Sequence, residues 1–172
     1  MRRLALVLLP ALALAGGVFV ITVGAPLLLA SQPNAAPRQP IPFDHSVHVR
    51  SAGIDCAFCH RSAARGVVAG LPDLEQCMAC HAVVGQGQAD IETLRNAWSA
   101  QTPIDWMRVH RLPDHTRFVH AAHIQAGIAC ATCHGDVASM QQVAEVRSLK
   151  MNDCIACHQQ TGAPTECATC HY

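Results

Sequence analysis

Aromatic residues and charges are scarce in this chain of 172 residues. Phe, Trp and Tyr make up 4% of the sequence and charged residues 14%, so a core made of side chains alone would be thin. Twelve basic residues balance twelve acidic ones, which argues against a nucleic-acid-binding surface and against an acidic tail. Something other than side chains must therefore fill the interior.

No cysteine lies outside a Cys-x-x-Cys-His motif. The ten cysteines form five copies of it, which leaves no thiol for a disulfide framework. On a helical turn, residues i, i+3 and i+4 share a face, so two thiols can bond to one porphyrin while the histidine reaches its iron. The pattern is that of c-type haem attachment. Structural zinc is the alternative, but five motifs cannot pair evenly and zinc would leave the five following histidines without a role.

The sequence thus predicts five covalently bound haem c groups. The thioether pairs would be Cys56 with Cys59, Cys77 with Cys80, Cys130 with Cys133, Cys154 with Cys157, and Cys167 with Cys170. The proximal iron ligands would be His60, His81, His134, His158 and His171.

The N-terminus carries a long uncharged segment. Arg2 and Arg3 precede residues 4–30, which as a helix would span roughly 40 Å against a hydrocarbon core of about 30 Å. A removed signal peptide is the alternative, but its apolar region would be shorter. The one plausible cleavage site follows Ala30, and Leu28 then occupies the −3 position, which needs a small residue. We expect residues 1–30 to be a retained single-pass anchor in the bacterial inner membrane, with the haem domain on the periplasmic side.

A repeated unit follows this segment. Residues 31–42 contain four prolines and are expected to form an extended tether. The domain would then cover residues 43–172, in which FDHSVHVRSAGIDCAFCH (43–60) recurs as FVHAAHIQAGIACATCH (118–134). The duplicated units are 43–81 and 118–158, and a further haem motif stands at 167–171.

The stretch between the two units, residues 82–117, holds one expected helix. Asp90 is a possible N-cap, and Ile91, Leu94 and Trp98 share a face. Strand signals are almost absent. Five haems on residues 31–172 leave about 28 residues per haem, too few for separate pockets. The predicted fold is mainly α with extensive loops, with stacked haems as the core and one N-terminal transmembrane helix.

Six histidines remain for the distal positions of five irons. His45 and His48, like His120 and His123, are spaced i, i+3 just before a haem motif, and we expect all four to be distal ligands, with His110 as the fifth histidine. For His115, a loop position or a haem-propionate neighbour is favoured over ligation. Met151, three residues before Cys154, is a candidate thioether ligand that would raise one haem potential.

The FxHxxH…CxxCH unit resembles the class III multihaem cytochromes c. The segments AGLPDLEQCMACH (69–81), IDWMRVHRLPDHTRFVHAAHIQAGIACATCHGDVASM (104–140), SLKMNDCIACH (148–158) and the ending ECATCHY are similar to the pentahaem cytochrome subunit of alternative complex III, a quinol:electron-acceptor oxidoreductase. The resemblance covers nearly all of residues 41–172. It implies a periplasmic position beside an iron–sulfur/molybdopterin-like subunit and quinol-binding membrane subunits, and haem ligation by His45, His48, His110, His120 and His123.

Three functions are compatible with these features. The favoured one is a non-enzymatic electron-transfer subunit between a quinol-oxidising membrane complex and a periplasmic acceptor, such as a monohaem cytochrome c or an oxidase. A multihaem enzyme acting on nitrogen compounds would need an iron with an open position, and here six histidines can close all five. A stand-alone single-span quinol dehydrogenase is the third, against which five haems, the tether and the paired histidines weigh.

Overall fold

The computed structural model describes residues 17–24 and 36–172. Residues 1–35 and 36–172 form two separate units. In the first, a helical turn at 17–19 continues as the π-helix η1 (Val20–Gly24). Among the described residues, no helix has both the length and the apolar character that a membrane span requires. The rest of the expected anchor (1–30), and the tether up to residue 35, lie outside the described residues.

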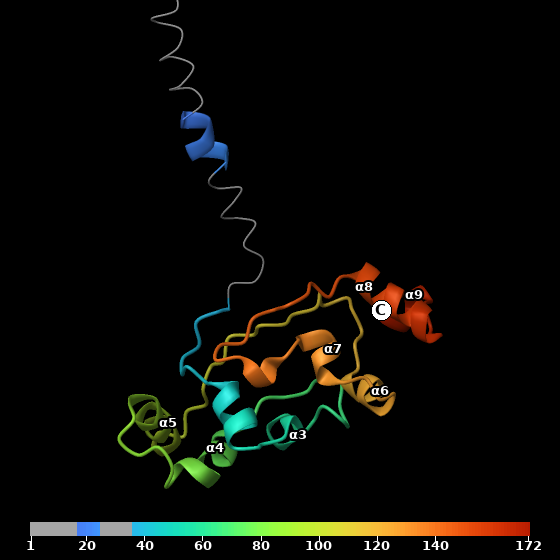
Figure 1. Cartoon of the computed structure of the whole chain (residues 1–172). Coiled ribbons are helices and arrows are strands. Elements are labelled where there is room, and N and C mark those ends of the chain that lie inside the picture. Colours follow the sequence, from blue (N-terminus) through green and yellow to red (C-terminus); the bar gives the residue numbers. More distant parts are fainter. Residues whose placement is uncertain (1–16, 25–35) are drawn as a thin grey trace, which may run out of the picture. The chain divides into compact units, whose positions relative to one another are not determined.

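The unit 36–172 is built from short helices joined by long irregular segments (Figure 1). This confirms the mainly helical, loop-rich fold. Across residues 36–172 no strand forms, and the one β-type contact is an isolated bridge between Thr116 and His171. The elements in chain order are η2 (Ser46–Ser51), α3 (Cys56–Cys59), α4 (Leu74–His81), α5 (Ala89–Ser99), α6 (His120–Gln125), α7 (Cys130–His134), η3 (Val137–Ser139), α8 (Met151–Thr161) and α9 (Cys167–Cys170).

Local capping explains where several of these helices begin. The Asp55 side chain accepts a hydrogen bond from the backbone of Ala57 at the start of α3. Asp73 does the same for Gln76 at the start of α4. An aspartate at the N-cap satisfies one of the free N–H groups of the first turn. Two of the haem motifs are therefore placed on helices whose N-termini are fixed by the preceding sequence.

The expected helix between the repeats is present as α5, and Leu94 is its buried residue. The expectation of Asp90 as N-cap is wrong, because the helix begins at Ala89 and Asp90 lies in its first turn. Helix α5 packs against α4. The Arg95 guanidinium donates to the carbonyls of His81 and Ala82, 3.1 and 3.0 Å away, at the C-terminus of α4. This spacer helix thus holds the end of α4 that carries His81.

The two repeats interlock in a reciprocal way. In the first repeat, Ser46 N donates to Met140 O, 3.3 Å away in the loop after the third motif. In the second, Ala121 N donates to Gly66 O, 3.1 Å away in the loop after the first motif. Each His-x-x-His segment is therefore pinned to the loop that follows a haem motif in the other repeat.

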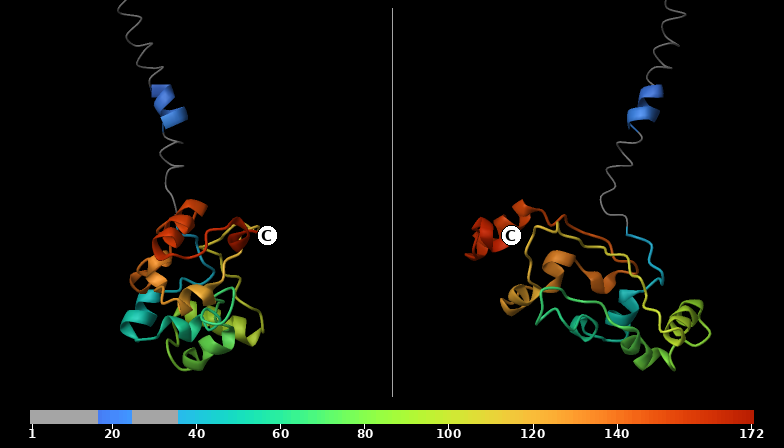
Figure 2. Two further views of the ribbon diagram at one scale, coloured as in Figure 1. Left: turned by 90° about the vertical axis from the view of Figure 1, so that its right-hand side faces the viewer. Right: turned by 180° about the vertical axis from the view of Figure 1, so that it is seen from behind.

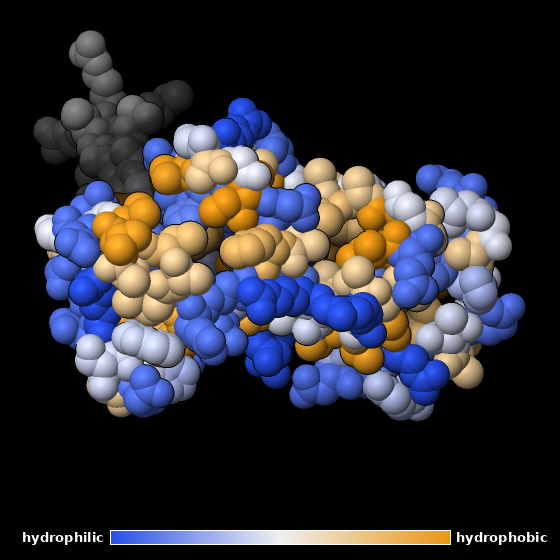
Figure 3. All heavy atoms as spheres, turned by 90° about the horizontal axis from the view of Figure 1, so that it is seen from below, coloured by the Kyte–Doolittle hydropathy of each residue, from blue (hydrophilic) through white to orange (hydrophobic). Residues whose placement is uncertain are grey.

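Few side chains are buried. In the described part of the chain, the apolar residues below one-tenth exposure are Ile41, Leu94 and Ala121. Large apolar side chains such as Phe58, at 47% exposure, and Val68, at 67%, remain at the surface. Figure 3 shows apolar residues in several places on one face of the unit, between polar ones. Large apolar side chains that stay at the surface are available to pack against a bound apolar group.

Candidate functional site

The five motifs lie on or at the end of helices. Three of them begin with the first residue of their helix, at Cys56 in α3, Cys130 in α7 and Cys167 in α9. The motif of Cys77 ends α4, and that of Cys154 lies inside α8. All ten cysteines are free thiols, either exposed or half-buried. Every thiol is thus accessible for a covalent bond to a porphyrin.

The two thiols of each predicted thioether pair differ in exposure, which the motif spacing did not predict. In α4 and α8 the first thiol, Cys77 or Cys154, is half-buried, whereas the second, Cys80 or Cys157, is exposed. In the three motifs that begin their helices the order is reversed, with the first thiol exposed and the second half-buried. The burial of a thiol therefore follows the place of its motif in the helix. Cys80 and Cys157 remain predicted attachment points, and each is the more exposed thiol of its pair.

Four pairs of histidine rings have similar separations between their centres. A metal–imidazole bond of about 2 Å, plus about 1 Å from nitrogen to ring centre, puts the ring centres of a bis-histidine iron roughly 6 Å apart. The observed separations of ring centres are 6.0 Å for His48–His81, 6.0 Å for His123–His158, 6.4 Å for His120–His134 and 5.5 Å for His115–His171. Each pair joins one proximal histidine to one of the other six.

The hydrogen bonds of these rings fix which nitrogen is free. A carbonyl can only accept, so a ring whose Nδ1 contacts one carries its proton there, and in the neutral ring Nε2 keeps the lone pair. Seven histidines have such a contact, at 2.5–3.3 Å. They are His48, His60, His81, His120, His123, His158 and His171. Their free Nε2 is the nitrogen that an iron needs.

His45 is the exception among the upstream histidines. In the described part of the chain, its Nδ1 is a buried side-chain nitrogen with no hydrogen-bond partner. Burial lowers the pKa of His45, and the positive charges of His60 and His48 lower it further. His60, the proximal histidine of the first motif, is the charged group with the largest effect on the pKa of His45. An unpartnered buried nitrogen is costly unless a bound group or solvent contacts that nitrogen.

His110 has a different geometry from the paired histidines. Its ring centre is 4.4 Å from that of His134, with the two planes at 89°. Its Nε2 lies 3.4 Å from the Nδ1 of His134. This separation is too short for an iron between the rings. The structure thus brings His110, which we expected to be a distal ligand, to the side of His134 that faces away from Nε2.

The two remaining ligand candidates also differ in position. The centre of the His115 ring lies 5.5 Å from that of His171, with 24° between the planes. Backbone contacts hold this arrangement, since Thr116 bridges to His171 and Arg117 N donates to Cys170 O, 2.7 Å away. Met151, by contrast, is the first residue of α8 and is 60% exposed.

Thiols of neighbouring motifs lie close enough to affect one another's pKa. Burial raises the pKa of Cys56, and the nearby Cys130 raises it further. Burial likewise raises the pKa of Cys77, with Cys59 as the next cause.

Thiols of neighbouring motifs also affect one another's pKa at the other end of the unit. Burial raises the pKa of Cys154, followed by Cys170 and, more weakly, Cys133. The helices that carry the motifs follow one another as α4, α3, α7, α8 and α9 across Figure 1, and in the reverse direction in the rear view of Figure 2. The attachment sites therefore form a single file, with 77–81 at one end and 167–171 at the other.

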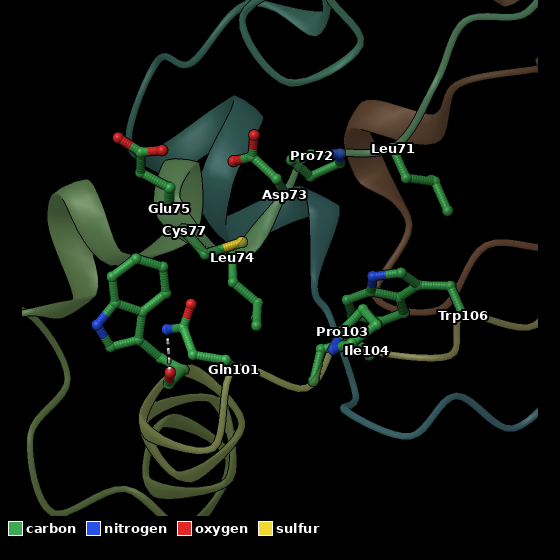
Figure 4. Close-up of a pocket in the computed structure, with 11 residues that line it drawn as sticks. Leu71, Pro72, Asp73, Leu74, Glu75, Cys77, Gln101, Pro103, Ile104 and Trp106 are labelled. Atoms are coloured by element: carbon green, nitrogen blue, oxygen red, sulfur yellow. Dashed lines mark hydrogen bonds between the residues drawn. The ribbon is translucent and has the colours of Figure 1, made fainter.

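A hollow of about 390 Å³ adjoins the 77–81 end. Figure 4 shows Leu74, Cys77 and Gln101 on one side of it and Ile104 and Trp106 on the other. Trp98 also lines it, so both tryptophans of the chain contribute. The leucine, isoleucine and tryptophan side chains of this mixed lining lie beside a motif thiol and suit a large flat group attached at Cys77.

These observations fit haem at the motifs. The thiols are free, the rings are paired near the separation for an axial iron, and the buried apolar core is too small to support the unit alone. Across residues 17–24 and 36–172, no three His, Cys, Asp or Glu side chains converge as a metal-ion site would require. The histidines meet in pairs instead, apart from the additional contact of His110.

Comparison with known proteins gives two family matches. The model described as class III cytochrome C family matches residues 28–113, and the one described as cytochrome c7 and related cytochrome c matches residues 116–172. A relative from Nitratidesulfovibrio vulgaris, named menaquinone reductase, multiheme cytochrome c subunit, is 30% identical over 161 residues. The alignment covers 78% of this chain and 77% of that protein.

Proposed function

This chain belongs to the class III cytochrome c family and so carries covalently bound haem c, and we propose that it is a pentahaem electron-transfer subunit of a quinone-linked complex. The proposal places it in the bacterial inner membrane, anchored by residues 1–30, with residues 43–172 in the periplasm. The observation that carries it is the single file of five motifs. In four of them the proximal histidine is paired with a second histidine ring, and in the fifth the proximal histidine affects the pKa of a second one.

The ring separations support a distal ligand for four of the irons, and the electrostatic effect of His60 on His45 supports the fifth. Paired with their proximal partners, the distal ligands would be His45 for His60, His48 for His81, His120 for His134, His123 for His158 and His115 for His171. Neither Met151 nor His110 is needed as a ligand. With all five irons closed on both sides, substrate has no open position to bind. This favours electron transfer over an enzyme of nitrogen compounds.

The single file supports passage of electrons along the length of the unit. Haem supplies one-electron redox chemistry when bound. The chain keeps the attachment sites adjacent, because Cys59 is close to Cys77 and Cys56 is close to Cys130. Electrons would enter at one end of the file, at 77–81 or at 167–171, and leave at the other. The ends would therefore be the places where partner proteins dock.

Two directions of flow are candidates. The resemblance to the subunit of alternative complex III favours electrons leaving quinol for a periplasmic acceptor, such as a monohaem cytochrome c or an oxidase. The partners would then be an iron–sulfur/molybdopterin-like subunit and quinol-binding membrane subunits. The relative from Nitratidesulfovibrio vulgaris is named a menaquinone reductase, which favours the reverse direction in that protein. Both directions use the same file of sites.

The haem count is the first test. Mature protein should show a mass increase of five haem groups and a pyridine haemochrome ratio of five per chain. Replacing Cys167 and Cys170 with alanine should lower the ratio to four, which calibrates the assay. A ratio of four in the fully matured wild-type protein would disprove the pentahaem assignment.

The link to quinone is tested with the complex purified from native membranes in mild detergent. Addition of a menaquinol analogue should reduce the haems of this chain, and a quinol-site inhibitor should block that reduction. If only the reverse experiment works, in which a reduced periplasmic cytochrome drives quinone reduction, the menaquinone-reductase direction is correct. The isolated subunit should be reduced by soluble donors yet not turn over quinol, because residues 4–30 contain no Asp, Glu, His, Lys or Arg that could accept a quinol proton within the membrane. Rapid quinol oxidation by the isolated subunit would instead identify a stand-alone quinol dehydrogenase.

A further inference from the structure

His110 and His134 make the one side-chain to side-chain hydrogen bond between histidines in the described part of the chain. Their nitrogens are 3.4 Å apart, at the long end of the hydrogen-bond range. Both rings are half-buried. In a hydrogen bond between two ring nitrogens a single proton stands between them, so one ring donates and the other accepts.

The direction of the hydrogen bond follows from what His134 must do. In the proposed ligation its Nε2 carries the lone pair that faces the iron, so its proton stands on Nδ1. Nδ1 of His134 therefore donates, and Nε2 of His110 accepts. His110 must then carry its own proton on Nδ1. The charge of Glu145 lies close enough to act on the His110 ring.

We propose that His110 is a positioning residue for the third haem, accepting the Nδ1–H of the proximal ligand His134 and fixing its tautomer and orientation. This inference rests on the proposed haem attachment at 130–134. A hydrogen bond on the outer nitrogen of a ligating histidine raises its basicity and so stabilises the oxidised iron. The other proximal histidines donate from Nδ1 to backbone carbonyls, which no side-chain substitution removes. The third haem is thus the one whose potential a side chain sets in this way.

The first repeat supplies the reference for this arrangement. There the equivalent proximal ligand, His60, donates from Nδ1 to the carbonyl of Gly70, 2.7 Å away. The same outer nitrogen of His134 meets an imidazole instead. A ring nitrogen accepts along one direction in its own plane, so it restricts the rotation of His134 more than a carbonyl would.

The test uses the full-length protein with its haems and two substitutions, His110→Ala and His110→Gln. Haem content is measured first by mass and pyridine haemochrome. The five midpoint potentials and the ferric spin states are then measured by spectroelectrochemistry and electron paramagnetic resonance. In His110→Ala, one potential should rise by about 59 mV, a tenfold change in a one-electron equilibrium, while every haem stays low-spin. His110→Gln retains an acceptor oxygen, so the potential of that haem should lie close to its value in the wild-type protein.

Three other outcomes overturn the proposal. A new high-spin haem in His110→Ala would make His110 an iron ligand. Unchanged potentials in both variants would make it a packing residue. An equal shift in both variants would show that the acceptor is not what matters. If His110→Ala matures poorly, Glu145→Gln replaces it, and a smaller shift in the same direction is expected. Loss of the quinone-linked activity alone, with the potentials behaving as expected, would count against the proposed function and not against His110.

Discussion

The two repeats can be compared ring by ring. In the first, Phe43 stacks on His48 at 4.2 Å between ring centres and meets His45 edge-on at 4.8 Å. In the second, the equivalent phenylalanine lies 4.5 Å from His123 and 4.8 Å from His120, in the same two orientations. The phenylalanine and the two histidines therefore have the same relative geometry in both repeats.

The repeats differ at the first histidine of the pair. Nδ1 of His120 donates to Val67 O, 2.9 Å away, whereas Nδ1 of His45 is buried without a partner. They differ also at the proximal ligand, where His60 meets a backbone carbonyl and His134 meets His110. Local geometry is therefore the same within each repeat, and the contacts that distinguish the repeats come from elsewhere in the chain.

The largest expected effect concerns the second histidine of each pair, where the repeats agree. His48→Ala and His123→Ala should each turn one haem high-spin, because the iron loses an axial ligand while the thioethers hold the porphyrin. The affected haems would be those at 77–81 and 154–158. Electron paramagnetic resonance of the ferric protein gives the readout, and Gln125→Ala, on the same helix as His123, is the control. A response in one variant alone would break the equivalence of the repeats.

The next prediction concerns the motif that has no counterpart in the first repeat. His115→Ala should make the haem at 167–171 high-spin, because the centre of the His115 ring is 5.5 Å from that of His171, near the separation for an axial iron. Met151→Leu should leave all five haems low-spin, since Met151 is 60% exposed. A sulfur-to-iron charge-transfer band in the near infrared that disappears in Met151→Leu would assign this ligand position to Met151 instead.

A smaller effect is expected at the residue after the proximal ligand. The second repeat has Gly135 there, with φ +72°, where the first has Arg61. A Cβ on Gly135 would lie 2.7 Å from Cγ2 of Val146. Gly135→Ala should therefore destabilise the holoprotein by about 3 kcal/mol, from backbone strain and the clash together. Thermal unfolding followed by circular dichroism measures the loss.

Two further variants separate strain from clash at this position. Gly127 also has a positive φ, +80°, but a Cβ there would meet nothing within 4 Å. Gly127→Ala should cost about 1 kcal/mol, from strain alone. Adding Val146→Ala to Gly135→Ala should recover the difference. If Gly127→Ala is as damaging as Gly135→Ala, the close approach of Val146 has no energetic weight.

The parts that could be predicted from sequence are the local ones. The motif spacing predicted short helices, because i, i+3 and i+4 share a helical face, and the structure has them. The helix with Leu94 on its inner face was also predicted, although the role of Asp90 was wrong. The ring pair of His48 with His81 was not predicted by any pattern, but each member was chosen as a ligand candidate from the repeat.

The contacts that sequence did not indicate connect distant residues. His110 contacts a ring 24 positions away, and His115 lies against a ring 56 positions away. Both histidines belong to the irregular segment between α5 and α6, which has no periodicity to show which side faces inward. The Thr116–His171 bridge and the Arg117–Cys170 hydrogen bond bring this segment to the end of the chain. Only a three-dimensional arrangement could distinguish the positions of the two histidines.

The smallest expected effect is at the phenylalanine that begins each repeat. The Phe43 and Phe118 rings stack on His48 and His123 at 25° and 30° between the planes. Such aromatic pairs contribute about 1 kcal/mol beyond the area that they bury, and they restrict the rotation of the histidine ring. Phe43→Leu and Phe118→Leu should therefore lower stability by similar small amounts and alter the low-spin g-values of one haem each, without loss of ligation. Because Phe43 also faces Trp106 edge-on at 6.4 Å, its replacement should cost slightly more. Equal effects would show that the contact with Trp106 adds nothing. A high-spin haem in either variant would mean that the phenylalanine is required to hold the axial ligand in place.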